Sequence, residues 1–226
     1  MEKPYYKAIF LVLASDNDPI YKFFKTVWES YMFENPNIRV FFTYGQGTTF
    51  DRKEYDLVYD DLKETYTPPY MTTKVTRAMD HINQNYAYDY LIRTNLSTFW
   101  VFDSILKRLD TLPKQRCLAG KIGWIKPEFV TGTSMIISSD LIEPLLENQH
   151  LINRTFPKYQ AEDRLISNLL TQTLKVQIIS ASQYMCILEK YHQYDEQDMR
   201  LIIQKSRDQN VDHYRVKNFN SGDRLN

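Results

Sequence analysis

The chain has 226 residues with 28 basic and 28 acidic side chains, so its formal net charge is zero. A neutral chain has no overall basic field, which argues against nucleic acid and anionic membrane surfaces as partners. Hydrophobic residues make up 43% of the sequence and charged residues 25%, which is typical of a globular protein. This length fits one large α/β domain or two small ones.

Secretion and membrane signals are not recognisable in the sequence. No positively charged leader precedes a long apolar run, and no stretch approaches the roughly eighteen apolar residues of a membrane span. Cys117 and Cys186 show no metal-binding spacing, which fits a reducing compartment. We therefore expect a soluble, cytoplasmic protein without membrane insertion. The polar ending leaves open that this is one domain of a longer polypeptide, and the oligomeric state is not predicted.

The first half of the chain alternates strands with helices. Ala8–Leu13 is a continuous apolar run, as expected for a strand buried on both faces. A turn-rich segment and a helix through Tyr31 follow. The further predicted elements are strands at Asn37–Thr43, Asp56–Tyr59 and Tyr88–Arg93 and a helix over Thr72–Asn85. Such alternation predicts an α/β fold with a mainly parallel central sheet flanked by helices.

The pattern is looser after Trp100. Two strands are predicted, at 117–122 and 129–138, and Ser139 is predicted to cap a helix that begins at Asp140. A helix over 162–173 would bury one apolar face, made of Leu165, Ile166, Leu169 and Leu170. Another helix is expected at about 196–205. No linker divides the chain, so we expect a single domain over residues 1–226.

Ligands of open α/β sheets bind outside the carboxyl ends of the strands. Four polar loops follow predicted strands and are nominated by this rule: Ala14–Asp18, Thr43–Gly47, Asp60–Glu64 and Arg93–Ser97. The sequence contains neither the glycine-rich dinucleotide motif after the first strand nor a phosphate-binding P-loop. Dinucleotide dehydrogenases and P-loop NTPases are therefore poor fits.

Several ordered motifs resemble the β1,3-glycosyltransferases, the family of galactosyltransferases and fringe-like enzymes. The resembling stretches are Val40–Gly45, Asp60–Tyr66, Met71–Thr76, Tyr88–Phe99, Phe129–Leu141 and Ala161–Asp163, with His213 at the usual place of a C-terminal histidine. Small soluble glycosyltransferase domains of large DNA viruses are also similar. The resemblance spans about residues 8–217. It implies a single Rossmann-like domain of the GT-A type, with a nucleotide-binding half at about 1–100 and an acceptor-binding half at about 101–226.

The activity that this resemblance implies is transfer of a hexose or deoxyhexose from a nucleoside-diphosphate sugar, most readily a UDP-sugar, to a glycan hydroxyl. Asp163 would be the general base of an inverting reaction, and Glu162 is the second candidate. A retaining reaction stays open, with Asp163 positioning the acceptor. Two other readings stay open as well: a carbohydrate-binding or nucleotide-sugar-binding domain with altered catalysis, and a sugar-phosphate nucleotidyltransferase.

The donor-binding residues follow from the strand ends and from the matched motifs. They are Ala14, Ser15, Asp16, Tyr44, Lys74, Arg93, Thr94, Asn95, Ser97, Gly132, His213, Arg215 and Lys217. Tyr44 could stack on the base, and Gly132 could let the chain approach the sugar. His213, Arg215 and Lys217 alternate along an extended segment and would supply positive charge to the diphosphate. Trp100 and Trp124 are either sugar platforms or core residues.

The metal site that the family implies is altered in this sequence. Asn95 and Ser97 occupy the positions of the usual Asp-x-Asp pair, and with His213 they are the implied ligand positions. An amide and a hydroxyl are poor ligands for Mg²⁺ or Mn²⁺, which prefer carboxylates. Either a carboxylate from elsewhere, such as Asp60 or Asp61, binds the ion, or the enzyme works without one. We favour metal independence.

Overall fold

The computed structural model describes residues 2–17, 19–49, 51–65, 69–123, 125–155, 161–181, 184–187 and 211–216. The elements in chain order are β1 (Tyr5–Leu13), α1 (Pro19–Glu29), β2 (Ile38–Tyr44), β3 (Asp56–Val58), α2 (Tyr70–Asn85), β4 (Ala87–Asn95), β5 (Thr98–Trp100), α3 (Phe102–Leu109), β6 (Leu118–Gly120), β7 (Met135–Ser138), the 3₁₀ helix η1 (Ser139–Leu141), α4 (Ile142–Glu147), α5 (Gln149–Thr155), α6 (Glu162–Asn168), the π-helix η2 (Leu169–Thr173), β8 (Ile178–Ser180), β9 (Tyr184–Ile187) and β10 (His213–Val216). Within these residues, no helix combines the length and apolar character that crossing a bilayer requires.

The central sheet has seven strands in the order β3-β2-β1-β4-β7-β6-β8. Strands β3, β2, β1 and β4 pair in parallel, and β7 is antiparallel to both of its neighbours, β4 and β6. Strand β8 pairs in parallel with β6. The chain is therefore an α/β protein with a mostly parallel, Rossmann-like sheet, as the alternation of strands and helices predicts.

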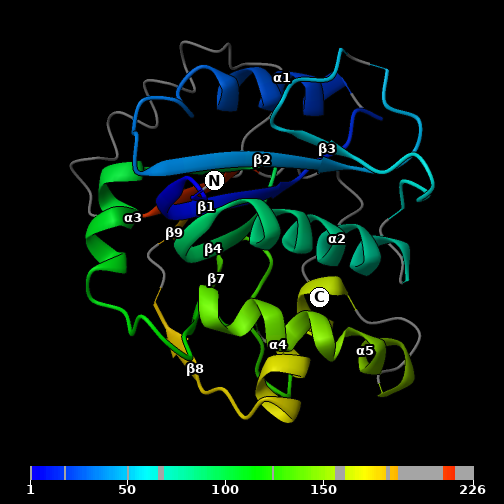
Figure 1. The fold of residues 1–226 in the computed structure, drawn as a ribbon. Helices are drawn as coiled ribbons and strands as arrows, with labels where there is room; N and C mark the ends of the chain where they lie inside the picture. Colours follow the sequence, from blue (N-terminus) through cyan, green and yellow to red (C-terminus); the bar gives the residue numbers. More distant parts are fainter. Residues whose placement is uncertain are drawn as a thin grey trace.

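Helices cover both faces of this sheet (Figure 1). Strand β1 shows why, because residues 8–12 are 0% exposed. Ala8, Phe10 and Val12 belong to a core with α1 and α3, whereas Ile9 and Leu11 belong to a second core with α2, α4 and α6. A strand buried on both faces cannot alternate polar with apolar residues. The central position of β1 therefore explains its uninterrupted apolar run.

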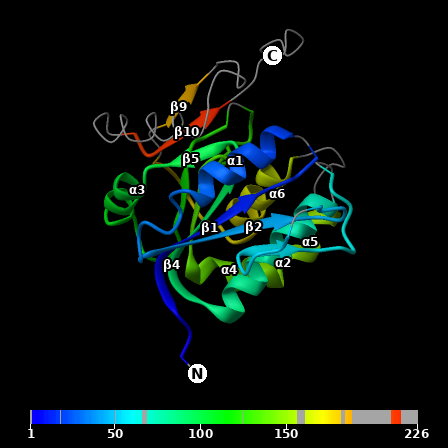
Figure 2. The same cartoon turned by 90° about the horizontal axis from the view of Figure 1, so that it is seen from above.

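A second, three-stranded sheet has the order β5-β10-β9 and lies beside α1 and α3 (Figure 2). Strand β10 pairs antiparallel with β5, placing Arg215 opposite Thr98 and His213 opposite Trp100. Through this pairing, the C-terminal strand reaches the segment that directly follows β4. Strand β10 therefore lies next to the end of the central parallel strands.

Several predicted boundaries need correction. Strand β5 and helix α3 are missing from the prediction, although Phe102, Ile105 and Leu109 of α3 are buried at helical spacing. The strand expected over 129–138 is regular only in β7, and Val130 forms an isolated bridge with Ile122. The residues between them turn around the end of β4 instead.

The helix boundaries also differ from the prediction. Ser139 does not cap a helix, because it is the first residue of η1. The helix over 162–173 is confirmed, and all four residues of its predicted apolar face are buried, but its last turn is the π-helix η2. The helix expected at 196–205 lies outside the described residues.

Substitution of Phe10 tests how much the aromatic core between the sheet and helices α1 and α3 stabilises the fold. Its ring is 0% exposed and lies 5.3 Å from the Trp100 ring and 5.5 Å from the Phe102 ring. We expect Phe10→Ala to lower the free energy of unfolding by about 3–5 kcal/mol, because it leaves a cavity in a packed core. Urea unfolding measures this loss. Phe33→Ala, at a side chain that is 60% exposed, should cost less than about 1 kcal/mol; similar losses in both variants would contradict this account.

Candidate functional site

A cavity of about 310 Å³ lies at the carboxyl ends of β1 and β4. These neighbouring strands mark the point where the strand order reverses, since β2 and β3 lie on one side of β1 and β4 on the other. Ligands of open α/β sheets bind at such a switch point, and the volume is within the range of small-molecule sites. The cavity is lined by Leu13, Ala14, Ser15, Tyr21, Glu64, Met71, Lys74, Arg93, Asn95, Leu96, Ser97, Ala161, Glu162, Asp163 and Arg215.

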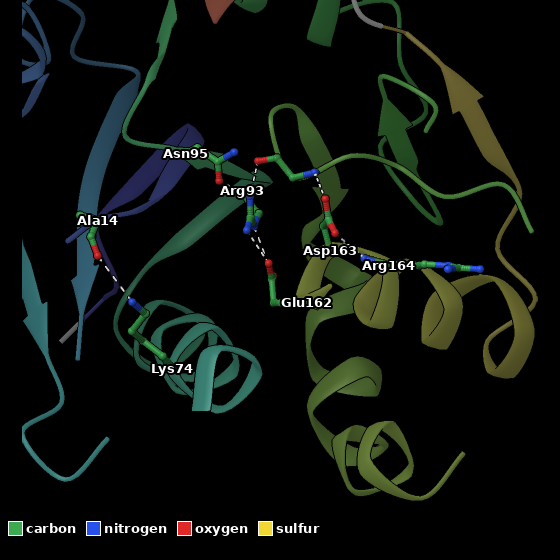
Figure 3. Close-up of polar contacts among 8 residues, drawn as sticks. Ala14, Lys74, Arg93, Asn95, Glu162, Asp163 and Arg164 are labelled. Carbon is green, nitrogen blue, oxygen red and sulfur yellow. Dashed lines mark hydrogen bonds and ion pairs between the residues drawn. The ribbon is translucent and has the colours of Figure 1, made fainter. Parts of the chain in front are cut away.

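Arg93, at the end of β4, is the centre of the hydrogen-bond network in this cavity (Figure 3). Its Nε donates to Glu162 Oε1 at 3.2 Å, and its Nη2 donates to Glu162 Oε2. Its Nη1 donates to Asn95 Oδ1 at 2.7 Å and to the carbonyl oxygen of Gly132. Both charged side chains are nearly buried, at 6% and 3% exposed. The sequence predicts Arg93 as a phosphate ligand, but the structure commits its guanidinium to protein partners.

Gly132 is required by this arginine. A Cβ added at Gly132 would lie 2.1 Å from Arg93 Nη1, far inside van der Waals contact. Any side chain there would push the guanidinium away from Glu162. Close packing against Arg93 is thus a structural reason for a glycine at this position, and the approach of the chain to a sugar stays a prediction.

Asp163 lies on the cavity wall with its carboxylate oriented by two backbone groups. Oδ2 accepts a hydrogen bond from the Gly132 N–H at 2.6 Å, and Oδ1 accepts one from the Arg164 N–H at 2.8 Å. The side chain is half-buried. Each carboxylate oxygen has a second lone pair, so Asp163 can still accept a proton or a hydroxyl hydrogen bond from a ligand in the cavity.

Glu162 is a weaker candidate for the base. It is 4% exposed, and both of its oxygens are bound by Arg93. Burial raises the pKa of the Glu162 carboxyl, while Arg93 beside it favours the charged form. A carboxylate enclosed in this way serves as the counter-charge of Arg93. Both neighbours line the cavity, but the structure pairs the Glu162 carboxylate with Arg93 and gives the Asp163 carboxylate only backbone N–H donors among the described residues.

Lys74 of α2 also lines the cavity, next to the end of β1. Its Nζ donates to Glu64 Oε1 at 2.7 Å and to the Ala14 carbonyl oxygen at 3.5 Å, and the residue is 2% exposed. Burial lowers the pKa of Lys74, and the charge of Glu64 opposes that shift. Glu64 also accepts a hydrogen bond from the Gly45 N–H. The sequence nominated the loop that ends at Glu64 without singling out this residue; its pairing with Lys74 is a tertiary contact.

Strand β10 brings Arg215 to the cavity, but not His213. The His213 ring is 0% exposed and stacks on Trp100 with centroids 4.4 Å apart. Burial lowers the pKa of His213 to about 3, so the imidazole is neutral near pH 7. His213 therefore does not supply charge to a diphosphate, which corrects the prediction from its spacing with Arg215.

Trp100 and Thr94 are buried and do not line the cavity. The Trp100 indole N–H donates to Thr94 Oγ1 at 3.0 Å, and the Thr94 hydroxyl donates to the Thr133 carbonyl at 2.8 Å. Both side chains are almost fully buried. Trp100 is thus a core residue and not a sugar platform, and Thr94 does not line the cavity. Trp124 and Lys217, also predicted, lie outside the described residues.

Asp16 and Tyr44 line a neighbouring cavity of about 320 Å³, which shares Ser15 and Tyr21 with the first. The Asp16 carboxylate accepts hydrogen bonds from the Thr49 N–H at 2.7 Å and the Thr49 hydroxyl at 3.1 Å. Tyr44 is 1% exposed, and the Lys25 ammonium lies 5.7 Å from its ring centroid. The expected stacking of a base on Tyr44 does not fit this arrangement.

The residues at the end of β4 do not fit a divalent cation. Arg93 directs its guanidinium at Asn95 Oδ1, the atom that Asn95 would offer to a metal. The other proposed carboxylates are engaged elsewhere: Asp60 is paired with Arg52, and Asp61 with Arg77. Across the described ranges, no group of three or more His, Cys, Asp or Glu side chains is placed to hold a metal.

Comparison with known proteins does not assign the chain to a family. Neither a protein-family model nor a curated protein sequence matches the chain. The resemblance to the β1,3-glycosyltransferases thus stays a prediction from the motifs.

The ion pair between Arg93 and Glu162 can be tested by removing one charge. We expect Glu162→Gln to lower the free energy of unfolding by about 3–5 kcal/mol, because it leaves a buried guanidinium without its counter-charge. Denaturant unfolding measures this change. The matched control is Glu128→Gln in the exposed pair with Lys126, for which less than about 1 kcal/mol is expected. A loss at Glu162 as small as the control would show that the pair is not buried as described.

The buried His213 predicts a pH-dependent stability. In the unfolded chain its pKa returns to about 6.5, whereas in the folded chain it is about 3. Between these values the unfolded chain binds a proton that the folded chain does not, so the contribution of His213 is complete above about pH 6.5 and is lost as the pH falls. From about pH 7.5 to pH 5, the loss from this residue should be about 2 kcal/mol.

Urea unfolding at the two pH values checks this expectation against His213→Phe, which has no proton to bind. The variant should lose about 2 kcal/mol less than the wild type over the same interval. His150→Gln, at an exposed position, should behave as the wild type does. Equal pH dependence in wild type and His213→Phe would contradict a neutral, buried His213.

Proposed function

We propose that the chain is a glycosyltransferase with a GT-A fold that moves a hexose or deoxyhexose from a nucleoside-diphosphate sugar, a UDP-sugar first of all, to a glycan hydroxyl. The observation that carries the proposal is the position of Asp163. Its carboxylate lies on the wall of the switch-point cavity and is oriented by the N–H groups of Gly132 and Arg164. The same cavity is lined by hydrogen-bond donors at the strand ends, as transfer from an anionic donor requires.

The donor would lie along the ends of β1 and β4. Ala14 and Ser15 line the cavity at the end of β1, where the nucleoside would lie, and Asn95, Ser97 and Arg215 line it beside β4, where the diphosphate would lie. Arg provides bidentate contacts to phosphate oxygens. Lys74 is already paired with Glu64, and it adds a positive charge to the lining of the same cavity. These groups would hold the leaving diphosphate as the bond to the sugar breaks.

The acceptor hydroxyl would approach from the side of Asp163. As its oxygen attacks the anomeric carbon, its proton passes to the Asp163 carboxylate, and the nucleoside diphosphate leaves from the opposite face of the sugar. The two backbone hydrogen bonds keep the carboxylate oriented without occupying all of its lone pairs. This arrangement supports inversion at the anomeric carbon.

A second candidate is a nucleotide-sugar-binding domain without transferase activity. Both oxygens of Asp163 already accept backbone hydrogen bonds, and the neighbouring Glu162 is enclosed by Arg93. A carboxylate bound in this way could serve the fold alone. The two functions differ in turnover and share donor binding, so a single variant can separate them.

Asp163→Asn is the variant that tests catalysis. Donors are first selected by isothermal titration with UDP-, GDP- and TDP-sugars, and turnover is followed by release of the nucleoside diphosphate, both in EDTA and with added Mg²⁺ or Mn²⁺. We expect the variant to lose about 10²–10⁴-fold in kcat, the usual contribution of a general base, while donor affinity changes less than about twofold.

Asp103→Asn is the matched control, because Asp103 is exposed on α3 and away from the cavity lining. It should keep full turnover. An Asp163→Asn enzyme as fast as the wild type would remove Asp163 from the role of base. A wild-type protein that binds a donor but turns over none would favour the binding domain, and one that binds no donor would end the proposal.

A further inference from the structure

The side-chain amide of Asn95 has only one possible orientation. Arg93 Nη1 lies 2.7 Å from Asn95 Oδ1, and a guanidinium can donate hydrogen bonds but cannot accept them. The amide atom facing Arg93 must therefore be the oxygen. The NH₂ group is consequently the part of Asn95 that remains for the cavity, and among the described residues no protein acceptor is bound to it.

The neighbouring groups on this wall of the cavity can also donate hydrogen bonds. The Ser97 side chain has no bound protein partner within the described ranges, and its backbone carbonyl accepts the Val216 N–H at 2.9 Å. That contact belongs to the sheet that carries Arg215, whose register partner is Thr98. Asn95, Ser97 and Arg215 thus line the cavity together as an amide, a hydroxyl and a guanidinium.

Two of the three acidic side chains that line this cavity are matched by positive ones. Glu162 is paired with Arg93, and Glu64 with Lys74. The Asp163 carboxylate is turned toward the Gly132 and Arg164 N–H groups. It lies on the other side of Arg93 from Asn95 (Figure 3). A divalent cation at the end of β4 would meet the Arg93 guanidinium and the Asn95 NH₂ group, both of which repel it. An anionic oxygen there would meet donors.

We infer that the end of β4 binds a diphosphate group directly, with the Asn95 amide acting as a hydrogen-bond donor beside Ser97 and Arg215. The inference deepens the proposed function and depends on it for the wider ligand, a nucleoside diphosphate. Arg93 acts as a positioning residue, because it turns the amide oxygen away and presents the NH₂ group. In this way a neutral Asn and Ser pair serves a site where carboxylates would require a bridging cation.

The probe is inorganic pyrophosphate, titrated into the full chain by calorimetry in EDTA, with UDP in a parallel titration. We expect wild-type protein to bind pyrophosphate in EDTA and to gain no more than about twofold when Mg²⁺ or Mn²⁺ replaces EDTA. Asn95→Asp should weaken binding in EDTA by about ten- to a hundredfold, since a donor to a charged oxygen becomes a repelling carboxylate. Tighter binding of UDP than of pyrophosphate would identify the nucleotide as the source of the diphosphate.

Two further variants keep the test decisive. Asn95→Ala removes the donor without adding charge and should give an intermediate loss, which decides the matter if Asn95→Asp does not fold. Gln84→Glu adds the same charge at an exposed position of α2 and should bind as the wild type does. Wild-type binding that requires an added cation, undetectable binding in both conditions, or unchanged binding by Asn95→Ala would each overturn the inference.

The outcome is separable from that of the proposed function. Pyrophosphate binding in EDTA without any sugar transfer would leave the anion site standing and would remove the transferase. Sugar transfer that occurs only with an added divalent cation would support the transferase and would overturn direct binding by Asn95.

Discussion

The buried pair of Arg93 and Glu162 is the interaction on which the site depends. It joins three parts of the chain that are distant in sequence: the end of β4, the turn at Gly132 and the start of α6. A buried ion pair does not by itself stabilise a fold more than apolar packing would, because both charges lose their hydration. Its effect here is positional, since the guanidinium has directional donors and each of its acceptors must be in place.

Three consequences follow from this single guanidinium. Gly132 has to lack a side chain, Asn95 has to present its NH₂ group to the cavity, and the Gly132 N–H is left to orient Asp163. The residues that resemble a ligand-binding motif therefore divide into two groups. Arg93 and Glu162 bind each other and hold the site together, whereas Asn95 and Asp163 present polar groups to the cavity. Both the proposed transfer and direct diphosphate binding depend on that division.

Much of the fold could be predicted because the central strands are buried on both faces. Such strands appear as unbroken apolar runs, and so β1, β2 and β4 were predicted close to their true limits. Three of the four loops that the sequence nominates line the cavity, through Ala14, Glu64 and Asn95, because the ends of these parallel strands meet at one edge of the sheet. Two elements are missing from the prediction. Strand β5 has only three residues, whereas helix α3 is missed although its buried residues Phe102, Ile105 and Leu109 recur at helical spacing.

The sequence alone determined the α/β class, the edge of the sheet where the cavity lies, and many of the residues that line it, since these follow from local hydrophobicity and chain order. Tertiary structure decided what each polar residue does. A sequence shows that Arg93, His213 and Asn95 are polar, but partners and burial settle their roles. Burial on Trp100 leaves His213 neutral, and contact with Glu162 commits Arg93 to the protein. The Arg93–Asn95 hydrogen bond decides which end of the amide is directed at Arg93 and which end remains for the cavity. Such roles are decided by the fold because hydrogen bonds and desolvation act through space and not along the chain.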